Sequence, residues 1–214
     1  MCFSEEVSWV TLATCWIGCV AMAATGKPHL QAMAGFLALV GGMQLWEALL
    51  WRNIGDGNTL CSPANGALSS AGAVNNHLEP VALYIMCALF LTPRSPMKSR
   101  VADLVMVAYV LVFGPLTASF LRRPLAERCA VHTPSGLVWQ WNEYGTKTFP
   151  AYALFLLAFV TTTYAYMPPG TDHTMAFVTV ASMVASYALY GGRGMAGSMW
   201  CFFAALVPWL SFFM

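Results

Sequence analysis

The stretch Ala67–Leu91 reads ALSSAGAVNNHLEPVALYIMCALFL. Its length suits a helix that crosses the hydrocarbon core of a bilayer, which needs about 20 mostly apolar residues. Its middle, from Asn75 to Pro80, instead places amide, imidazole and carboxyl side chains in one short run. Ionisable side chains cost roughly 3 kcal/mol each at the centre of a membrane helix, so they need partners from neighbouring helices. This stretch therefore predicts a membrane helix inside a bundle.

The composition of the whole chain favours the same class of protein. Hydrophobic residues make up 58% of the sequence, charged residues only 9%, and the mean hydropathy is +0.62. These values lie outside the range of soluble globular domains, so the lipid bilayer is the expected partner. The net charge is +1 and no face gathers Lys and Arg, which excludes nucleic acid as an expected partner.

Hydropathy predicts an all-α, polytopic transmembrane bundle of about seven helices, with residues 1–214 as a single integral membrane domain. The connections between most of these helices are short, so consecutive helices should run antiparallel. The predicted spans are Val7–Thr25, Leu30–Trp51, Ala67–Leu91, Val101–Leu121, Pro150–Met167, Met175–Tyr190 and Met195–Phe213.

One connection, Arg122–Phe149, is longer than the others and carries Trp139, Trp141 and Tyr144. Aromatic residues at such spacings are typical of a segment that lies at a membrane surface, and we expect this connection to fold on the end of the bundle. A turn signal around Ser135 separates two short β-prone runs, which predicts a small hairpin. An irregular interfacial loop is the alternative.

The rules for membrane orientation conflict in this sequence. With the amino terminus outside, more Lys and Arg residues fall in outer loops than in inner loops, which favours the opposite orientation. However, the acidic start at Glu5 and Glu6 is followed by Lys27, and Cys61 and Cys129 would then share the outer face, where a disulfide could form. We expect the amino terminus to be outside.

The run Asn75-Asn76-His77-Leu78-Glu79-Pro80 is the most informative polar feature. Asn75 and Asn76 lie one helical turn before Glu79, so these three side chains share a face that should turn toward the protein interior. Pro80 lacks an N–H, which leaves the carbonyl of Asn76 without its helical partner and bends the helix. Amides, a carboxylate, a free carbonyl and the imidazole of His77 can therefore gather at one depth.

A second polar stripe lies on the preceding predicted helix, where Gln44, Glu47 and Trp51 follow one another at spacings of three and four. Glu47 is expected to approach His77 or Glu79, because the two helices are antiparallel neighbours. Two carboxylates and a histidine in a dry site suit proton relay or divalent metal binding. The alternative is that these groups bond across helices only to fix packing. No lysine lies in the predicted spans, so retinal is excluded as a cofactor.

Three pieces of the sequence carry a family resemblance. The chain begins Met1-Cys2-Phe3-Ser4, has Gln44, Glu47 and Trp51 on one helix, and carries Ser198-Met199-Trp200-Cys201-Phe202-Phe203-Ala204-Ala205 near its end. Together these pieces resemble a family of uncharacterised small multi-pass membrane proteins of bacteria and large DNA viruses that begin with Met-Cys-Phe-Ser. The usual pattern has glycine after the glutamate, where this chain has Ala48. The resemblance implies a multi-pass membrane protein and no particular activity.

Cys2 is the sharpest enzyme-like feature. Removal of Met1 would leave Cys2 with an amine beside its thiol, a pair that can chelate a metal or act as a nucleophile. The alternative is that Met-Cys-Phe-Ser only seats the first helix, with Ser4 as its N-cap and two glutamates favourable to the helix dipole.

Three functional hypotheses follow from these residues, and a non-enzymatic function is favoured. The leading one is a small permease, channel or sensor whose polar core binds a proton, a metal ion or a small polar solute; that core comprises Gln44, Glu47, Asn75, Asn76, His77 and Glu79. The second is an intramembrane enzyme that uses the thiol of Cys2 or a divalent metal; the candidate ligands are Cys2, Glu47, His77 and Glu79. The third is a structural subunit of a larger assembly.

Overall fold

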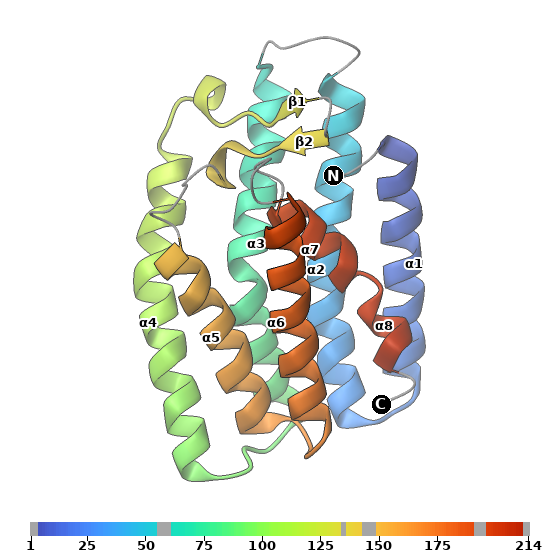
Figure 1. The fold of residues 1–214 in the computed structure, drawn as a ribbon, viewed down its shortest axis with the longest axis vertical. Helices are drawn as coiled ribbons and strands as arrows, with labels where there is room; N and C mark the ends of the chain where they lie inside the picture. The colour runs from blue at the N-terminus through green and yellow to red at the C-terminus, as the bar shows by residue number, and fades with distance from the viewer. Residues whose placement is uncertain (1–3, 55–60, 134–135, 143–148, 191–195, 212–214) are drawn as a thin grey trace.

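The computed structural model describes residues 4–54, 61–133, 136–142, 149–190 and 196–211. Its described part is all-α apart from one hairpin (Figure 1). The α-helices are α1 (Glu5–Ala24), α2 (Pro28–Ile54), α3 (Pro63–Phe90), α4 (Pro96–Leu121), α5 (Phe149–Tyr166), α6 (Thr171–Tyr190), α7 (Ala196–Ala204) and α8 (Val207–Leu210). Between α4 and α5 lie η1 (Leu125–Glu127), β1 (Val131–Thr133), β2 (Gly136–Val138) and η2 (Gln140–Asn142).

The first six predicted spans each coincide with one helix, and serine caps explain where several begin. Ser4 accepts a hydrogen bond from the backbone N–H of Val7 at 3.2 Å, which confirms it as the N-cap of α1. Ser62 and Ser95 cap α3 and α4 in the same way, and each is followed by a proline at the first helical position. Helices α3 and α4 therefore begin several residues before the apolar stretches that predicted them.

The seventh predicted span, Met195–Phe213, is wrong as a single helix, because the chain breaks into α7 and α8 at residues 205–206. Pro208 has no N–H to donate to the carbonyl of Ala204, so an α-helix cannot continue unbroken through this point. The break lets α8 approach α1 closely: a methyl group at Gly18 would lie 2.7 Å from Cβ of Pro208. Trp209 secures this contact by donating from its indole N–H to the carbonyl of Thr14 at 3.0 Å.

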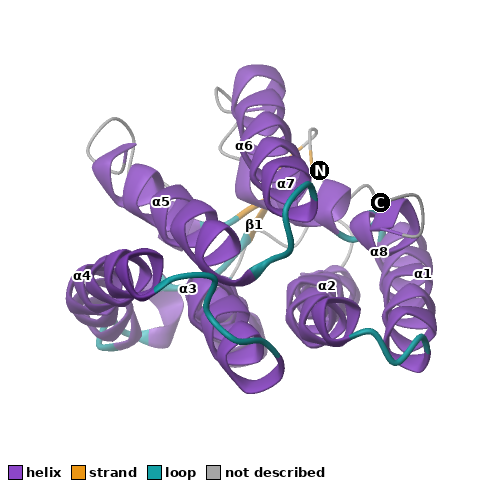
Figure 2. Ribbon diagram, turned by 90° about the horizontal axis from the view of Figure 1, so that it is seen from below, coloured by secondary structure: helices purple, strands orange, loops and turns teal. Residues whose placement is uncertain are grey.

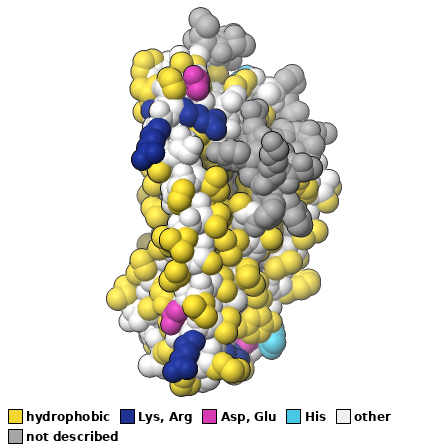
Figure 3. All heavy atoms as spheres, turned by 90° about the vertical axis from the view of Figure 1, so that its left-hand side faces the viewer, with side chains coloured by type: hydrophobic (Ala, Val, Ile, Leu, Met, Phe, Trp, Pro, Cys, Tyr) yellow, Lys and Arg dark blue, Asp and Glu magenta, His cyan; other side chains and the backbone are white. Residues whose placement is uncertain are grey.

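Within the part of the chain that the structure describes, α1, α2 and α4 are long and apolar enough to cross a membrane. A helix of 20 residues, the length of α1, spans about 30 Å, the thickness of a bilayer's hydrocarbon core. The face seen in Figure 3 has hydrophobic side chains over its middle and Lys and Arg toward both ends. The protein is therefore an integral membrane protein with three candidate spans.

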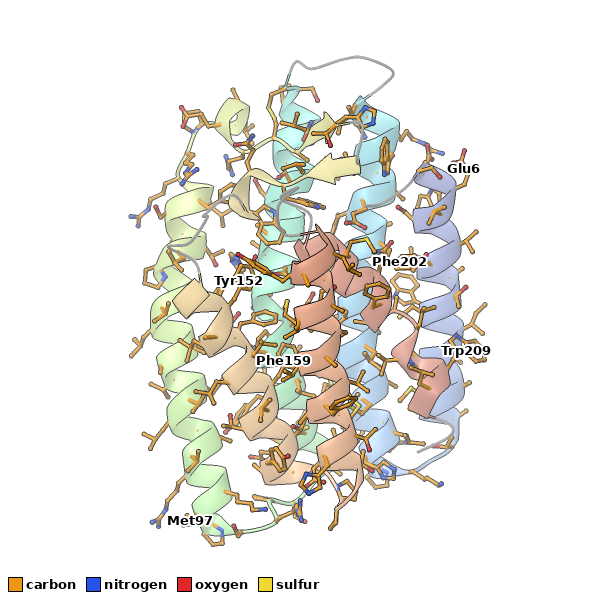
Figure 4. The ribbon with its side chains drawn as sticks, in the orientation of Figure 1. Glu6, Met97, Tyr152, Phe159, Phe202 and Trp209 are labelled. Atoms are coloured by element: carbon orange, nitrogen blue, oxygen red, sulfur yellow. A yellow bond between two sulfur atoms is a disulfide. The ribbon has the colours of Figure 1, made fainter. Side chains whose placement is uncertain are left out.

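Helix α2 is the centre of the bundle. It packs against α1 on one side and α3 on the other, as seen along the bundle in Figure 2, and also contacts α7 and α8. Helix α5 packs between α4 and α6 and contacts α3. The aromatic residues of α5 fill the space that remains: the ring of Phe159, labelled in Figure 4, lies 5.3 Å from Phe36 of α2 and 5.6 Å from Trp200 of α7.

The predicted hairpin is confirmed, and it lies across the end of the bundle where α2 ends and α3 begins (Figure 1). The structure joins Cys61 to Cys129 in a disulfide, with 5.6 Å between their Cα atoms. Asn65 on α3 adds two hydrogen bonds of 2.9 Å with the backbone N–H and carbonyl of Ala130. These links fix the segment before β1 to the start of α3.

The two tryptophans after the hairpin lie inside the protein, covered by other residues. Trp139 is fully buried and Trp141 is 2% exposed, whereas Tyr144 lies outside the described residues. The ring of Trp139 rests on α3 at Gly72, where a side-chain methyl would come within 2.5 Å of Cζ3. The described part of this connection therefore folds on the end of the bundle, as predicted, and its two tryptophans pack inward.

We predict that Gly72→Ala destabilises the protein, because the added methyl collides with the buried Trp139 ring. Overpacking of this kind costs about 1–3 kcal/mol in the free energy of unfolding. Gly114→Ala is the matched control, because a methyl there meets nothing within 4 Å and alanine is favoured over glycine within a helix by roughly 0.5–1 kcal/mol. Thermal unfolding in detergent compares the two variants, and equal stability would contradict this packing.

Candidate functional site

Asn76 and Glu79 of α3 meet Cys201 of α7 inside the bundle. The Asn76 amide nitrogen Nδ2 lies 3.5 Å from Glu79 Oε1 and 3.8 Å from Cys201 Sγ. Cys201 Sγ lies 3.8 Å from the same Glu79 oxygen, which accepts from both donors. All three residues are buried, with Glu79 and Cys201 at zero exposure and Asn76 at 4%. We name Asn76, Glu79 and Cys201 the acid cluster.

The carboxyl group of Glu79 is only weakly supported in this cluster. The contacts to Oε1 are long for hydrogen bonds, and one of them comes from a thiol, which is a weak donor. Oε2 is buried and has no hydrogen-bond partner among the residues that the structure describes. An ionised carboxylate taken out of water without a cation or strong donors is costly, so this burial favours the neutral carboxylic acid.

Helix α7 reaches the cluster because Trp200 anchors it. The indole N–H of Trp200 donates to Ser182 Oγ of α6 at 3.0 Å, and its ring lies 5.4 Å from that of Phe155 on α5. Trp200 therefore ties α7 to α5 and α6. The next residue, Cys201, then faces α3 from a short helix that ends at Ala204, one turn later.

The proline that follows Glu79 interrupts the hydrogen-bond ladder of α3 beside the cluster. Pro80 is buried inside the helix and cannot donate to the carbonyl of Asn76. The neighbouring carbonyl of His77 accepts a hydrogen bond of 2.7 Å from the hydroxyl of Tyr109 on α4. The backbone of α3 at this depth is thus supported from another helix, and the cluster lies where the helix lacks one hydrogen bond.

The imidazole of His77 points toward α4 and does not join the acid cluster. Its Nδ1 lies 2.6 Å from Thr117 Oγ1, whose hydroxyl donates to the carbonyl of Phe113. The ring also packs edge-on against Phe113 and Trp141 at 5.1 and 5.5 Å. This placement follows from helix geometry, because two residues correspond to about 200° of rotation and put His77 nearly opposite Glu79.

Asn75 binds α2 rather than the acid cluster. Its Nδ2 donates to the carbonyl of Leu39 at 3.0 Å, and its Oδ1 accepts from the indole N–H of Trp46 at 3.3 Å. A methyl group at Gly42 would lie 3.0 Å from that same Oδ1. Asn75 is therefore a packing residue between α2 and α3, which is the alternative that the sequence left open for these polar groups.

Gln44 and Glu47 are fully buried on α2, the helix that contacts both α3 and α7. The predicted metal site is not formed by the described residues, which contain no group of three His, Cys, Asp or Glu side chains suited to a metal ion. Part of the reason is that His77 faces α4, away from Glu79. Cys2, the fourth candidate ligand and the candidate nucleophile, lies outside the described residues.

Sequence reasoning missed Cys201 and Tyr109. Cys201 lies in an apolar stretch, where a thiol normally behaves as a small hydrophobic side chain. The residues around it give no sign that it contacts a carboxyl group 122 positions earlier in the chain. Tyr109 lies in a similarly apolar helix. The signal that could have found it was Pro80, since an interrupted helix calls for an outside donor.

Comparisons with protein-family models, with curated proteins and with solved structures find no match to this chain.

The two neighbouring asparagines should respond differently to substitution. Asn75→Ala leaves the indole N–H of Trp46 without its acceptor, and we expect a loss of about 1–3 kcal/mol in the free energy of unfolding. Asn76→Ala removes only long contacts, so its stability loss should be smaller, but it changes the surroundings of Glu79.

Thermal unfolding measures the first effect, and the infrared carbonyl band of a protonated Glu79 reports the second. Asn76→Ala should shift that band and Asn75→Ala should leave it in place. The opposite pattern would contradict the division between packing and cluster residues.

Proposed function

We propose that this protein is a multi-pass membrane protein of about seven spans that binds a proton at Glu79 and couples it to movement across the membrane, as a small permease. The observation that carries the proposal is the burial of Glu79, whose carboxyl group has zero exposure and whose Oε2 has no hydrogen-bond partner in the described part of the chain. Ionisable residues at such positions are costly, which makes a functional role the default interpretation.

Weak partners make Glu79 suited to gaining and losing a proton. A neutral acid can stay in this site, whereas an anion would need the bundle to open to water or bring in a cation. Protonation and conformation are then linked: the form that exposes the carboxyl group to water favours ionisation, and the closed form favours the acid. This linkage is what a proton-coupled carrier requires.

The backbone on both sides of the cluster favours transport over a static packing role. Helix α3 continues through Pro80 but lacks one backbone hydrogen bond next to Glu79, and α7 ends at Ala204, one turn after Cys201. Solute and ion sites of many transporters lie where discontinuous helices meet, because irregular backbone there is shielded from lipid. A small polar solute that hydrogen-bonds the Asn76 amide is the cargo that this cluster would fit.

A proton is a better ligand than a metal ion for this cluster. Divalent metals need several oxygen, nitrogen or sulfur ligands at once, and the acid cluster offers one carboxyl group, one thiol and one amide. The thiol- or metal-dependent enzyme built on Cys2 stays a prediction, as does the structural subunit. Membership of the family that begins Met-Cys-Phe-Ser is likewise a proposal, which rests on the three sequence pieces.

Glu79→Gln should abolish proton movement, because glutamine keeps the shape of the side chain and cannot ionise. Purified protein in liposomes with an internal pH dye is given an acid step outside, and the rate of internal acidification is compared. Glu127→Gln is the matched control, since Glu127 is exposed on η1. Wild-type rates in Glu79→Gln would overturn the proposal, and a lost rate in both variants would contradict the role of Glu79 specifically.

We further propose that the end of the bundle carrying the disulfide faces the oxidising side of the membrane, with the amino terminus outside. Disulfides persist in oxidising compartments, and Cys61 pairs with Cys129 at this end. The start of α1 lies at the same end, because Glu5 forms an ion pair of 3.0 Å with Arg52 near the end of α2.

The two ends of α4 test this orientation. In a Cys2→Ser background, Arg122→Cys and Met97→Cys place exposed thiols at opposite ends of one helix. A membrane-impermeant maleimide should label Arg122→Cys in intact cells and Met97→Cys only after permeabilisation. The native free cysteines in the described residues are buried and should react slowly. The reverse labelling pattern would place the amino terminus inside.

A further inference from the structure

An apolar groove runs along the outside of the bundle between α1 and α3. Its volume is about 360 Å³, and its floor is the surface of α2 at Ala34 and Gly35. Val20 of α1 forms one wall, and Met86 and Phe90 of α3 form the other. Both walls pack on α2, which lies between them (Figure 2). The groove is separate from the acid cluster, which faces α7.

The groove is open to the surroundings of the protein. Val20 is 69% exposed and Phe90 is 43% exposed, so the rims of both walls face outward. Because Gly35 has no side chain, Met86 of α3 packs directly on α2: a methyl there would lie 2.6 Å from Sδ of Met86. The small residues Ala34 and Gly35 therefore leave the floor of the groove low between α1 and α3.

In a bilayer the surroundings of this groove are lipid chains. Helices α1 and α2, which supply one wall and the floor, are two of the candidate spans. Water has almost no polar partners on these walls, and an empty groove would forfeit the dispersion contacts of its lining. A hydrocarbon chain satisfies both conditions, so an acyl chain is the occupant that the setting requires.

The end of the groove nearest the α1–α2 connection has a different chemistry. Gln31, in the first turns of α2, contributes the groove's polar side chain, and Ala23 marks the same level on α1. Lys27 is exposed in the connection, and its carbonyl accepts from the backbone N–H of Gln31 at 3.0 Å. An amide at the rim and an ammonium group beyond it match the ester and the phosphate of a phospholipid in that order.

We propose that this groove binds one acyl chain of an anionic phospholipid, with the phosphate at Lys27 and the ester region at Gln31. Basic residues close to a membrane surface attract anionic lipids, and Lys27 is the cation that follows the groove's polar end. Lys98 and Arg100 lie in the first turns of α4, away from the groove's lining, and Arg94 is paired with Asp172.

Two pairs of variants test the site in the full-length protein. Ala23→Phe fills the groove, and its control Ala24→Phe adds the same ring at the adjacent exposed position outside the lining. Lys27→Gln removes the proposed phosphate partner, and Lys98→Gln removes a cation at the same end of the bundle away from the groove. All four changes lie at surface positions, so the fold should survive.

The measurement is native mass spectrometry of purified protein titrated with dioleoyl phosphatidylglycerol or dioleoyl phosphatidylcholine. We expect one phosphatidylglycerol to bind wild type, Ala24→Phe and Lys98→Gln alike, and occupancy to fall about tenfold in Ala23→Phe and several-fold in Lys27→Gln. Equal occupancy in Ala23→Phe and Ala24→Phe would overturn the groove as the site. Equal binding of the two lipids, or equal loss in both lysine variants, would overturn the anionic headgroup at Lys27.

Discussion

Hydrocarbon cannot form hydrogen bonds, and the arrangement around α3 follows from that constraint. The asparagine, histidine and glutamate side chains of this helix each have a partner from a different element or are enclosed by the bundle. Asn65 bonds the segment before the hairpin, Asn75 bonds α2, and His77 bonds α4. The need to pair these groups fixes which helices pack against α3 and how α3 is rotated about its own axis. A rotation by about 100°, one residue, would point each side chain at a helix that does not offer its partner. Glu79 is the member of this series with the weakest support.

The sequence predicted the helices well because their signals are local. Apolar length identifies six of the helices, but it placed the starts of α3 and α4 several residues late, because the serine-proline pairs that begin them were not used as a signal. The hairpin was also accessible from its turn residues. The break between α7 and α8 was missed, although Pro208 is a local signal, because the surrounding residues are apolar enough to hide the interruption. The aromatic spacing placed the connection correctly on the end of the bundle, but nothing nearby in sequence reveals that Trp139 packs inward on Gly72.

The candidate site was predictable only in part. Helical periodicity correctly grouped Asn76 with Glu79, but it could not separate Asn75 from them, since one residue of rotation is within the uncertainty of a face drawn from sequence. Cys201 could not be found in this way. Its role depends on a contact between two helices far apart in the chain, and a buried thiol has no composition signal of its own. Neither helical periodicity nor composition predicts which residues far apart in the chain come into contact.

The contact between α8 and α1 bears on how such a protein is made. Helix α1 emerges from the ribosome before α8, yet one of its faces receives Pro208 and Trp209 of α8, and the contact between Trp209 and Thr14 joins residues 195 positions apart. Until α8 has been synthesised, the carbonyl of Thr14 and the close-packing surface at Gly18 lack this native partner. The native surroundings of α1 are therefore completed only after α8 has been made, so this part of the bundle cannot be assembled one span at a time.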